Sequence, residues 1–260
     1  GYNPSKNTRA NIVLWRKSEN CGSVTFTGTP LLGHEHGIQS LAFNNDSSKL
    51  VSVGTSDDTN IYVWSVTKNT LTNTAKLSDV VNDVLWFKDS IITVGNRGCL
   101  SLWETDDEAL SLHEQKLILE TVDIQANFTP TYTCAALAPK WVAKGFLVDA
   151  ILCVGDTDGC VHVVSIPDGR RLSHIKACTG EVTCIAWGEK KIIIGTSEKL
   201  VAYSYPNESL EPMCTVDFPI ASMEWENEGE EGIFTTLKKP GISTAEVYFM
   251  NIRKNHFMRI

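Results

Sequence analysis

Short apolar segments recur along the chain at similar spacing, with polar turns between them. The segments are rich in Val, Ile and aromatic residues, which favour β-strands, and the turns hold Gly, Asp and Asn. No segment keeps a helical period over several turns, although one short helix is expected within residues 109–120, in an insertion. The pattern therefore predicts an all-β chain made of many short strands.

The clearest copy of this pattern runs from Gly33-His34 to Trp64. Its parts follow the order Gly-His, apolar strand, turn, apolar strand ending in Gly, Asp, and a strand ending in Trp. The three strands are expected at 38–43, 49–54 and 60–64. This order resembles the WD repeat, and the resemblance implies a β-propeller built from four-stranded blades.

Four weaker copies follow the first one. Their three inner strands are expected at 80–87, 90–95 and 99–103; at 131–137, 150–155 and 160–165; at 182–187, 191–195 and 199–205; and at 220–225, 232–237 and 246–252. An outer strand is expected before four of the five inner sets, at 23–32 for the first copy, from residue 71 for the second, at 171–175 for the fourth and at 213–218 for the fifth. A lone strand at 11–15 comes first, and 256–260 is a candidate for a further outer strand.

The prediction is a WD-repeat β-propeller with five full blades and an incomplete blade at each end, in a single domain over residues 1–260. A propeller ring has to close on itself to protect its strand edges. The ring closes with six blades if the two ends share one blade. It closes with seven if the remainder lies in a longer protein, of which this sequence is then a portion.

Charge and cysteine content narrow the function classes. The net charge of −8 and the sequence pI near 5.3 argue against nucleic-acid binding, which depends on clustered Lys and Arg. No apolar run is long enough for a transmembrane helix. The eight cysteines include no Cys-x-x-Cys pair, which favours reduced, buried thiols over disulfides or a zinc site. We therefore expect a cytoplasmic protein with no membrane partner.

His34, Asp58 and Trp64 form the strongest constellation of polar and aromatic residues. The resemblance to WD repeats implies that a His, a hydroxyl group, an Asp and a Trp form one hydrogen-bond network, and Ser52 or Thr55 supplies the hydroxyl. A His–Asp pair beside a hydroxyl also suggests a hydrolase triad. A structural tetrad is favoured, because such a network satisfies buried polar groups and holds the blade in shape.

No other segment predicts catalysis. Residues 156–159 resemble the start of a calcium loop, but position twelve of that loop is Pro167, so a turn between strands is favoured. Phosphate-binding glycine loops, His-Glu-x-x-His and Gly-x-Ser-x-Gly do not occur in the sequence. We therefore expect no enzyme activity, no cofactor and no metal.

Three segments differ from ordinary turns, at 104–130, 139–147 and 224–231. The first is longer than most connections, the second mixes aromatic and basic residues, and the third concentrates acidic charge. Loops on a rigid scaffold often bind partners, and aromatic residues are enriched at binding hot spots. The alternative for the acidic run is a solvated loop, and the alternative for Trp141 is packing against a blade edge. The candidate partner-binding residues are His36, Trp141, Phe146, Glu226, Glu228, Glu230 and Glu231.

Residues 33–103 are similar to propellers of the echinoderm-microtubule-associated-protein-like family and of related spindle or MAP-kinase scaffold proteins. The similarity rests on the segments at 37–43, 57–64 and 92–97. It implies a non-catalytic scaffold in the cytoplasm or on the cytoskeleton, with tubulin or a signalling or scaffold protein as partner. Two alternatives stay open: a propeller module of a ciliary, ubiquitin-ligase or RNA-processing complex, and a propeller enzyme with its ligands in the central channel.

Overall fold

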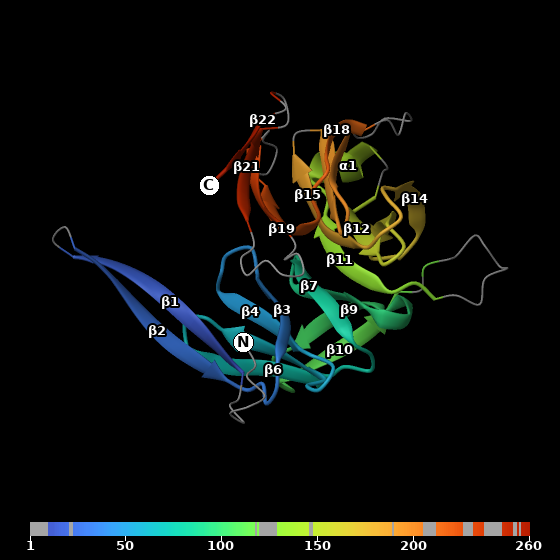
Figure 1. The fold of residues 1–260 in the computed structure, drawn as a ribbon. Helices are drawn as coiled ribbons and strands as arrows, with labels where there is room; N and C mark the ends of the chain where they lie inside the picture. Colours follow the sequence, from blue (N-terminus) through green and yellow to red (C-terminus); the bar gives the residue numbers. More distant parts are fainter. Residues whose placement is uncertain are drawn as a thin grey trace. The chain divides into compact units, whose positions relative to one another are not determined.

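The protein is almost entirely β-sheet, as Figure 1 shows for the computed structural model. The structure describes residues 10–20, 23–117, 119, 129–145, 148–188, 190–204, 212–225, 231–236, 246–251, 254 and 256–260. In these residues the helices are α1 (Lys140–Gly145) and a 3₁₀ turn at Asn96–Gly98. The predicted all-β class is therefore confirmed.

The strands belong to two compact units. The first unit consists of Gly1–Gly95 and Cys99–Lys116, and the second of Asn96–Gly98 and Leu117–Ile260. Each unit has its own buried apolar clusters. We describe each unit by itself.

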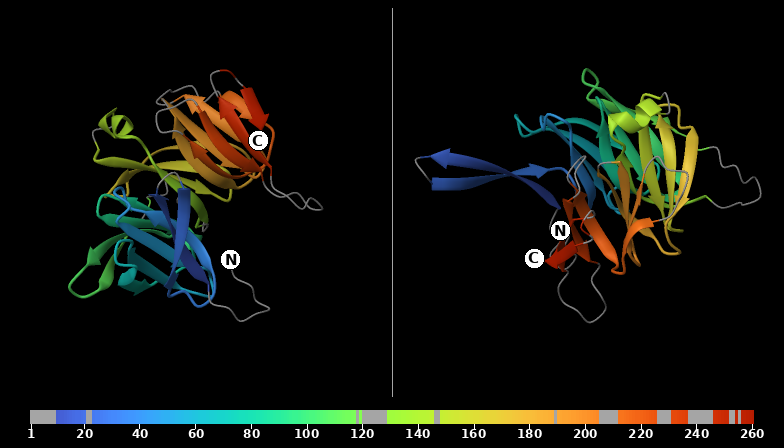
Figure 2. Two further views of the ribbon diagram at one scale, coloured as in Figure 1. Left: turned by 90° about the vertical axis from the view of Figure 1, so that its left-hand side faces the viewer. Right: turned by 90° about the horizontal axis from the view of Figure 1, so that it is seen from above.

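The first unit contains ten strands in two sheets. They are β1 (Asn11–Asn20), β2 (Ser23–Leu32), β3 (Ile38–Phe43), β4 (Lys49–Gly54), β5 (Asn60–Ser65), β6 (Thr70–Lys76), β7 (Val81–Phe87), β8 (Ser90–Gly95), β9 (Leu100–Asp106) and β10 (Ser111–Lys116). Strands β3 to β6 form the first four-stranded blade and β7 to β10 the second, and a parallel bridge between β6 and β10 joins them into one eight-stranded sheet. Strands β1 and β2 form a separate two-stranded hairpin, which extends away from the other strands of this unit (Figure 2).

The second unit contains three four-stranded antiparallel blades. The third blade consists of β11 (Tyr132–Leu137), β12 (Ala150–Asp156), β13 (Cys160–Ile166) and β14 (Arg171–Lys176). The fourth consists of β15 (Val182–Gly188), β16 (Lys191–Thr196), β17 (Leu200–Ser204) and β18 (Pro212–Val216). The fifth consists of β19 (Ile220–Trp225), β20 (Glu231–Thr236), β21 (Val247–Asn251) and β22 (His256–Arg259). The predicted count of five full blades and one partial blade at the start is therefore confirmed.

The outer strands belong to other blades than the sequence suggested. The segment at 23–32 was expected as the outer strand of the first blade, but β2 pairs with β1, and β6 pairs with β5. In the same way β14, β18 and β22 each complete the blade whose inner strands precede them in the chain. The physical reason is that antiparallel strands joined by a short turn pair locally. Strand β22 therefore ends the fifth blade and does not begin another.

Two local predictions were wrong. The segment at 109–120 was expected to form a short helix, but β10 pairs along its length with β9 and buries Leu112. Cross-strand pairing and burial outweigh the local helix preference here. Residues 140–145 lie in a connection that was expected to be a loop, and they form the helix α1, which buries Val142 and Ala143.

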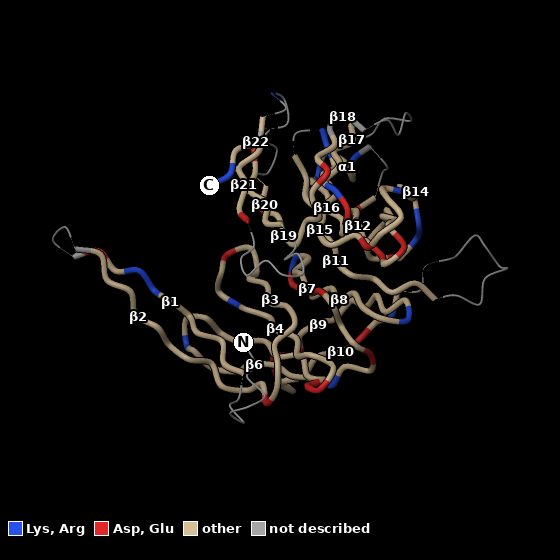
Figure 3. The backbone as a smooth tube through the Cα atoms, viewed as in Figure 1, with Lys and Arg blue, Asp and Glu red and all other residues tan. Residues whose placement is uncertain are grey.

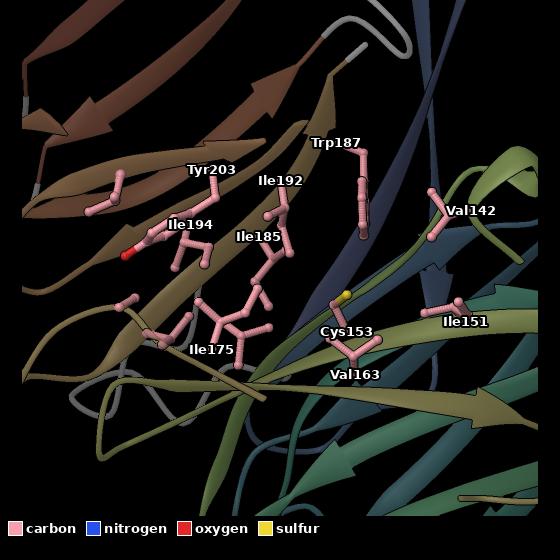
Figure 4. Close-up of a cluster of buried hydrophobic side chains, with 14 of the residues drawn as sticks. Val142, Ile151, Cys153, Val163, Ile175, Ile185, Trp187, Ile192, Ile194 and Tyr203 are labelled. Carbon is pink, nitrogen blue, oxygen red and sulfur yellow. The ribbon is translucent and has the colours of Figure 1, made fainter. Parts of the chain in front are cut away.

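The second strand of a blade is buried along its length where both faces of the blade are covered. Strands β12 and β16 have no exposed position. Figure 4 shows part of the cluster between the third and fourth blades, where Ile151 and Val163 face Ile185 and Ile192. Strand β20 instead alternates between exposed and buried side chains, so one face of the fifth blade is uncovered in the described residues.

The six described cysteines are free, and burial raises the pKa of Cys184 to about 12.

Candidate functional site

A hydrogen-bond network links four side chains in the first blade. The indole N–H of Trp64 on β5 donates to Oγ of Ser52 on β4 over 2.9 Å. Ser52 Oγ lies 2.9 Å from Nε2 of His34, and Nδ1 of His34 lies 3.1 Å from Oδ2 of Asp58. All four residues are buried. Ser52 therefore supplies the hydroxyl group of the network.

The protonation states of the network follow from burial and from the donors around Asp58. Burial lowers the pKa of His34, and the neighbouring Asp58 opposes this only in part. Burial alone would raise the pKa of Asp58, but hydrogen bonds from Asn60 and from the backbone N–H of Glu35 outweigh it, so this pKa lies below its usual value. A neutral His34 then donates its Nδ1–H to Asp58 and accepts the Ser52 O–H at Nε2.

The network has the residue types of a Ser-His-Asp catalytic triad, but the surroundings of Ser52 oppose that role. A nucleophilic serine needs an accessible Oγ with space for a substrate carbonyl beside it. Ser52 is fully buried, and its Oγ accepts the indole N–H of Trp64. The geometry therefore supports a structural role, in which the network ties β4 and β5 to the segment that precedes β3.

The third blade holds a second His–Asp pair, which the sequence analysis did not single out. Nε2 of His162 on β13 lies 2.8 Å from Oδ2 of Asp156, the last residue of β12. Oδ1 of Asp156 accepts the backbone N–H groups of Asp158 and Cys160 at 2.9 and 2.8 Å. Residues 156–159 thus form the turn between two strands. The sequence signal for this pair was an Asp at the end of one strand and a His near the start of the next.

The structure places only part of the residues that were predicted to bind a partner. His36 is exposed in the first unit, with its backbone N–H 3.4 Å from Oδ2 of Asp58. Glu231 is exposed at the start of β20 and accepts a hydrogen bond from Asn251. Trp141 belongs to α1. Phe146, Glu226, Glu228 and Glu230 lie outside the described residues.

Apolar side chains are exposed along one face of the β1–β2 hairpin, and we call this set the hairpin face. Its members are Val13, Trp15, Val24, Phe26 and Leu32. They share one face because side chains alternate along a strand and the two strands pair without a register shift. Trp15 lies opposite Gly28, and its ring occupies the space that a side chain at Gly28 would fill. The sequence analysis placed strands here but missed this surface.

The opposite face of the hairpin packs against the first blade. Ile12, Leu14 and Leu31 form a buried cluster with Leu50 of β4 and Trp64 of β5. Arg16 extends this contact through a hydrogen bond of 2.8 Å to the side chain of Asn69 and another to the carbonyl oxygen of Val66. The first half of β1, residues 11–15, is docked on the blade and carries no charge. The charged residues of this strand lie in its second half, residues 16–20 (Figure 3). The hairpin is thus docked at its inner end, with the hairpin face turned away from the first blade.

A groove lies between β1 and β3 in the first unit. Residues 10–13 line one side and residues 38–41 the other, and its volume is about 460 Å³. Strand β1 pairs only with β2, so no described strand pairs with its other edge. The groove, this strand edge and the hairpin face together form the candidate binding surface.

Comparisons with known proteins show the fold. No protein-family model matches the sequence, and no curated protein matches it. The crystal structure of the Myceliophteria thermophila Cps50 (Swd1) β-propeller domain is similar, with a TM-score of 0.70 and 14% sequence identity over 91% of this chain and 78% of that chain. The computationally designed Ika8 protein is similar with a TM-score of 0.62 and 16% identity, over 91% of this chain and 67% of that chain. The chain therefore has the β-propeller fold, and the microtubule-associated subgroup stays a prediction.

In the described residues, no helix is both long and apolar enough to cross a membrane. In the same residues, no three His, Cys, Asp or Glu side chains form a group that could hold a metal ion.

Proposed function

We propose that this chain is a non-catalytic protein-interaction scaffold, and that the hairpin face is one of its partner-binding surfaces. The β-propeller fold is typical of WD40 proteins that act as interaction scaffolds. The observation that carries the proposal is the exposure of Trp15 and Phe26, two large aromatic side chains on one face of an antiparallel strand pair. Aromatic side chains of this kind commonly supply the binding energy at the centre of an interface.

The surroundings of the hairpin face also suit an interface. The charged residues Arg16, Lys17 and Glu19 lie on the second half of β1, so polar groups flank the apolar first half. An apolar centre with a polar rim is the usual anatomy of a protein interface. Blade strands bury most of their side chains against neighbouring blades, whereas these two strands keep one face open.

The resemblance of residues 33–103 to microtubule-associated propellers supports a finer form of the proposal, in which the partner is cytoskeletal and tubulin is the first candidate. The 260-residue chain is sedimented with polymerised tubulin over a range of tubulin concentrations. If tubulin is a partner, the chain enters the pellet in a saturable way. If the chain stays in the supernatant at every concentration, tubulin is rejected and a module of a larger regulatory assembly becomes the better description.

The role of the hairpin face is tested with matched variants. Trp15→Ser and Phe26→Ser remove exposed aromatic groups, and Leu110→Ser removes an exposed apolar group from a turn elsewhere in the first unit. The chain and its variants are immobilised, and proteins captured from the native source are quantified by mass spectrometry. We expect at least one protein to be captured by the parent and by the Leu110 variant and lost from both aromatic variants. Equal capture by all variants would assign binding to another surface, such as the loops at His36 or Glu231.

A further inference from the structure

Strand β1 has the position of the third strand of a blade, but it lacks the neighbour that third strands have. In the five full blades the third strand, β5, β9, β13, β17 or β21, pairs with a strand on each side. The run Ile12 to Trp15 has the same pattern as Ile61 to Trp64 of β5, with the first and third residues facing the next core cluster. In the described residues, one edge of β1 therefore carries unpaired backbone groups, which is a template for another strand.

Trp15 is exposed where the corresponding tryptophans are buried. Trp64 and Trp103 each donate the indole N–H to a hydroxyl on the neighbouring second strand, Ser52 or Thr93, at 2.9 Å. Both of these tryptophans are 2% exposed, whereas Trp15 is 68% exposed. A second strand beside β1 would contact Trp15 from one side, as β4 contacts Trp64 through Leu50, and would offer a hydroxyl at the same level.

Two residues of the first blade are also exposed, at the place where strands added beside β1 would lie. Leu41 and Phe43 on β3 are each 47% exposed. The corresponding residues of the second blade, Val84 and Trp86 on β7, are 3% and 7% exposed, because the inner strands of the first blade cover them. The correspondence follows from pairing: Leu41 pairs with Ser52 as Val84 pairs with Thr93. In the part of the chain that the structure describes, no inner strands of a preceding blade lie beside Leu41 and Phe43, and this explains their exposure.

We propose that β1 and β2 are the outer pair of a blade whose inner pair is a β-hairpin donated by a partner protein. The inference rests on the proposed scaffold function and names the structure of the partner segment. Every other described strand already belongs to a four-stranded blade. Residues 1–9 and each run that separates described residues are shorter than β3 and β4 together, so no single one of them is long enough to supply the pair.

The existing blades define the chemistry of the donated hairpin. Its outer strand lies antiparallel to β1 in the groove between β1 and β3, and exchanges backbone hydrogen bonds with the edge of β1. The second strands β4 and β8 show the required side chains, which after the first residue are apolar on both faces except for one Ser or Thr next to the tryptophan. Its inner strand presents apolar side chains to Leu41 and Phe43. Main-chain bonds then supply affinity, and the hydroxyl and apolar positions supply specificity.

The probe is a synthetic hairpin with the sequence of residues 38–55, the inner pair of the first blade, with lysines added at its ends and a fluorescent label. Its binding to the whole 260-residue chain is measured by fluorescence anisotropy. Two further peptides carry N-methyl groups. In the first, these groups lie on the residues of the 49–54 segment whose N–H groups point away from the peptide's own 38–43 segment, because that set faces β1. In the second, a control, they lie on the outward-facing N–H groups of the 38–43 segment, which corresponds to the edge strand of the first blade. The first peptide should lose at least tenfold in affinity and the second should retain most of it.

Side-chain variants test the contact with Trp15. Trp15→Phe keeps an aromatic ring but removes the indole N–H, and a Ser-to-Val change in the peptide removes the expected acceptor. Each change should weaken binding about 3- to 10-fold, and the two together should cost little more than one, since they remove the same hydrogen bond. Leu110→Ser is the control and should leave the affinity unchanged, because Leu110 lies in a turn away from the groove. Hydrogen exchange gives an independent readout, in which the β1 amides become protected when the peptide binds.

The proposal is overturned if no peptide binds, if both N-methylated peptides bind as well as the parent peptide, or if Trp15→Phe and the Ser-to-Val change have additive effects. It is also overturned if the chain forms a dimer through this surface, shown by loss of dimer in Trp15→Ser, because the occupant is then a second copy. These outcomes are separate from failure of the scaffold proposal. A chain that captures partners through Trp15 and Phe26 but ignores every hairpin peptide remains a scaffold with a different kind of partner.

Discussion

Replacing Asp58 by alanine should destabilise the first unit by about 1–3 kcal/mol. The Asp58 carboxylate accepts hydrogen bonds from the His34 ring, the Asn60 side chain and two backbone N–H groups. After the substitution, His34 keeps a donor at Nδ1 with no acceptor while its ring stays 1% exposed. A buried donor without a partner costs about 1–3 kcal/mol, and the other donors are close enough to the surface to bind water instead.

The assay is urea unfolding of the 260-residue chain, followed by circular dichroism and by hydrogen exchange of the β4 amides, which report on the first unit alone. With a slope of about 2 kcal/mol per molar urea, a loss of about 2 kcal/mol moves the midpoint down by about 1 M. Asp57→Ala is the matched control, because the neighbouring carboxylate is exposed and its removal should change the free energy of unfolding by less than about 0.5 kcal/mol. Asp58→Asn should recover part of the loss, since the amide oxygen can still accept one bond.

Equal midpoints for Asp58→Ala and Asp57→Ala would refute this reasoning. That result would mean that His34 finds another acceptor or that its ring becomes hydrated at no cost. A lower slope in the Asp58 variant would instead show that the substitution changes how much surface unfolds, and the midpoint shift would then have to be interpreted with the new slope.

Substitutions of His34, Trp103 and Gly54 should each change the stability of the first unit. The pKa of His34 is lowered in the folded chain, so the unfolded chain binds more protons at this residue. The free energy of unfolding should therefore fall as the pH drops below 6.5. His34→Gln should flatten this pH dependence in urea titrations between pH 7 and 5. Trp103→Phe removes the donor to the buried Thr93 hydroxyl and should cost about 1 kcal/mol by the same urea assay, whereas a cost near zero would show that this hydrogen bond contributes nothing net. Gly54→Ala places a methyl group against the backbone carbonyl oxygen of Asp58 and should lower the melting temperature by several degrees in calorimetry, and an unchanged melting temperature would contradict the close approach.

The strands of the first blade and its polar network illustrate what could be predicted before the structure. The segments around β3, β4 and β5 carry their own signal, because apolar runs, Gly-Asp turns and a terminal Trp are local features. The grouping of His34, Ser52 and Asp58 came from the resemblance to WD repeats, which supplies residue roles that spacing alone does not. The His162–Asp156 pair was missed because it departs from that repeat order, although its geometry in the third blade is just as close.

The all-β class, the positions of most strands and their repetition as blades could all be predicted from the amino-acid sequence. The blade that each outer strand completes follows only from strand pairing in the folded chain, since β2 and β6 each precede three inner strands along the sequence and differ in the partner they pair with. Tertiary structure also decides exposure. Trp15 and Trp64 are the last residues of two similar runs, Asn11–Trp15 and Asn60–Trp64, yet one is exposed and the other buried. Burial therefore depends on which strands lie beside the residue and not on the residue itself. Such long-range neighbours leave no trace in a local pattern of hydrophobic and polar positions.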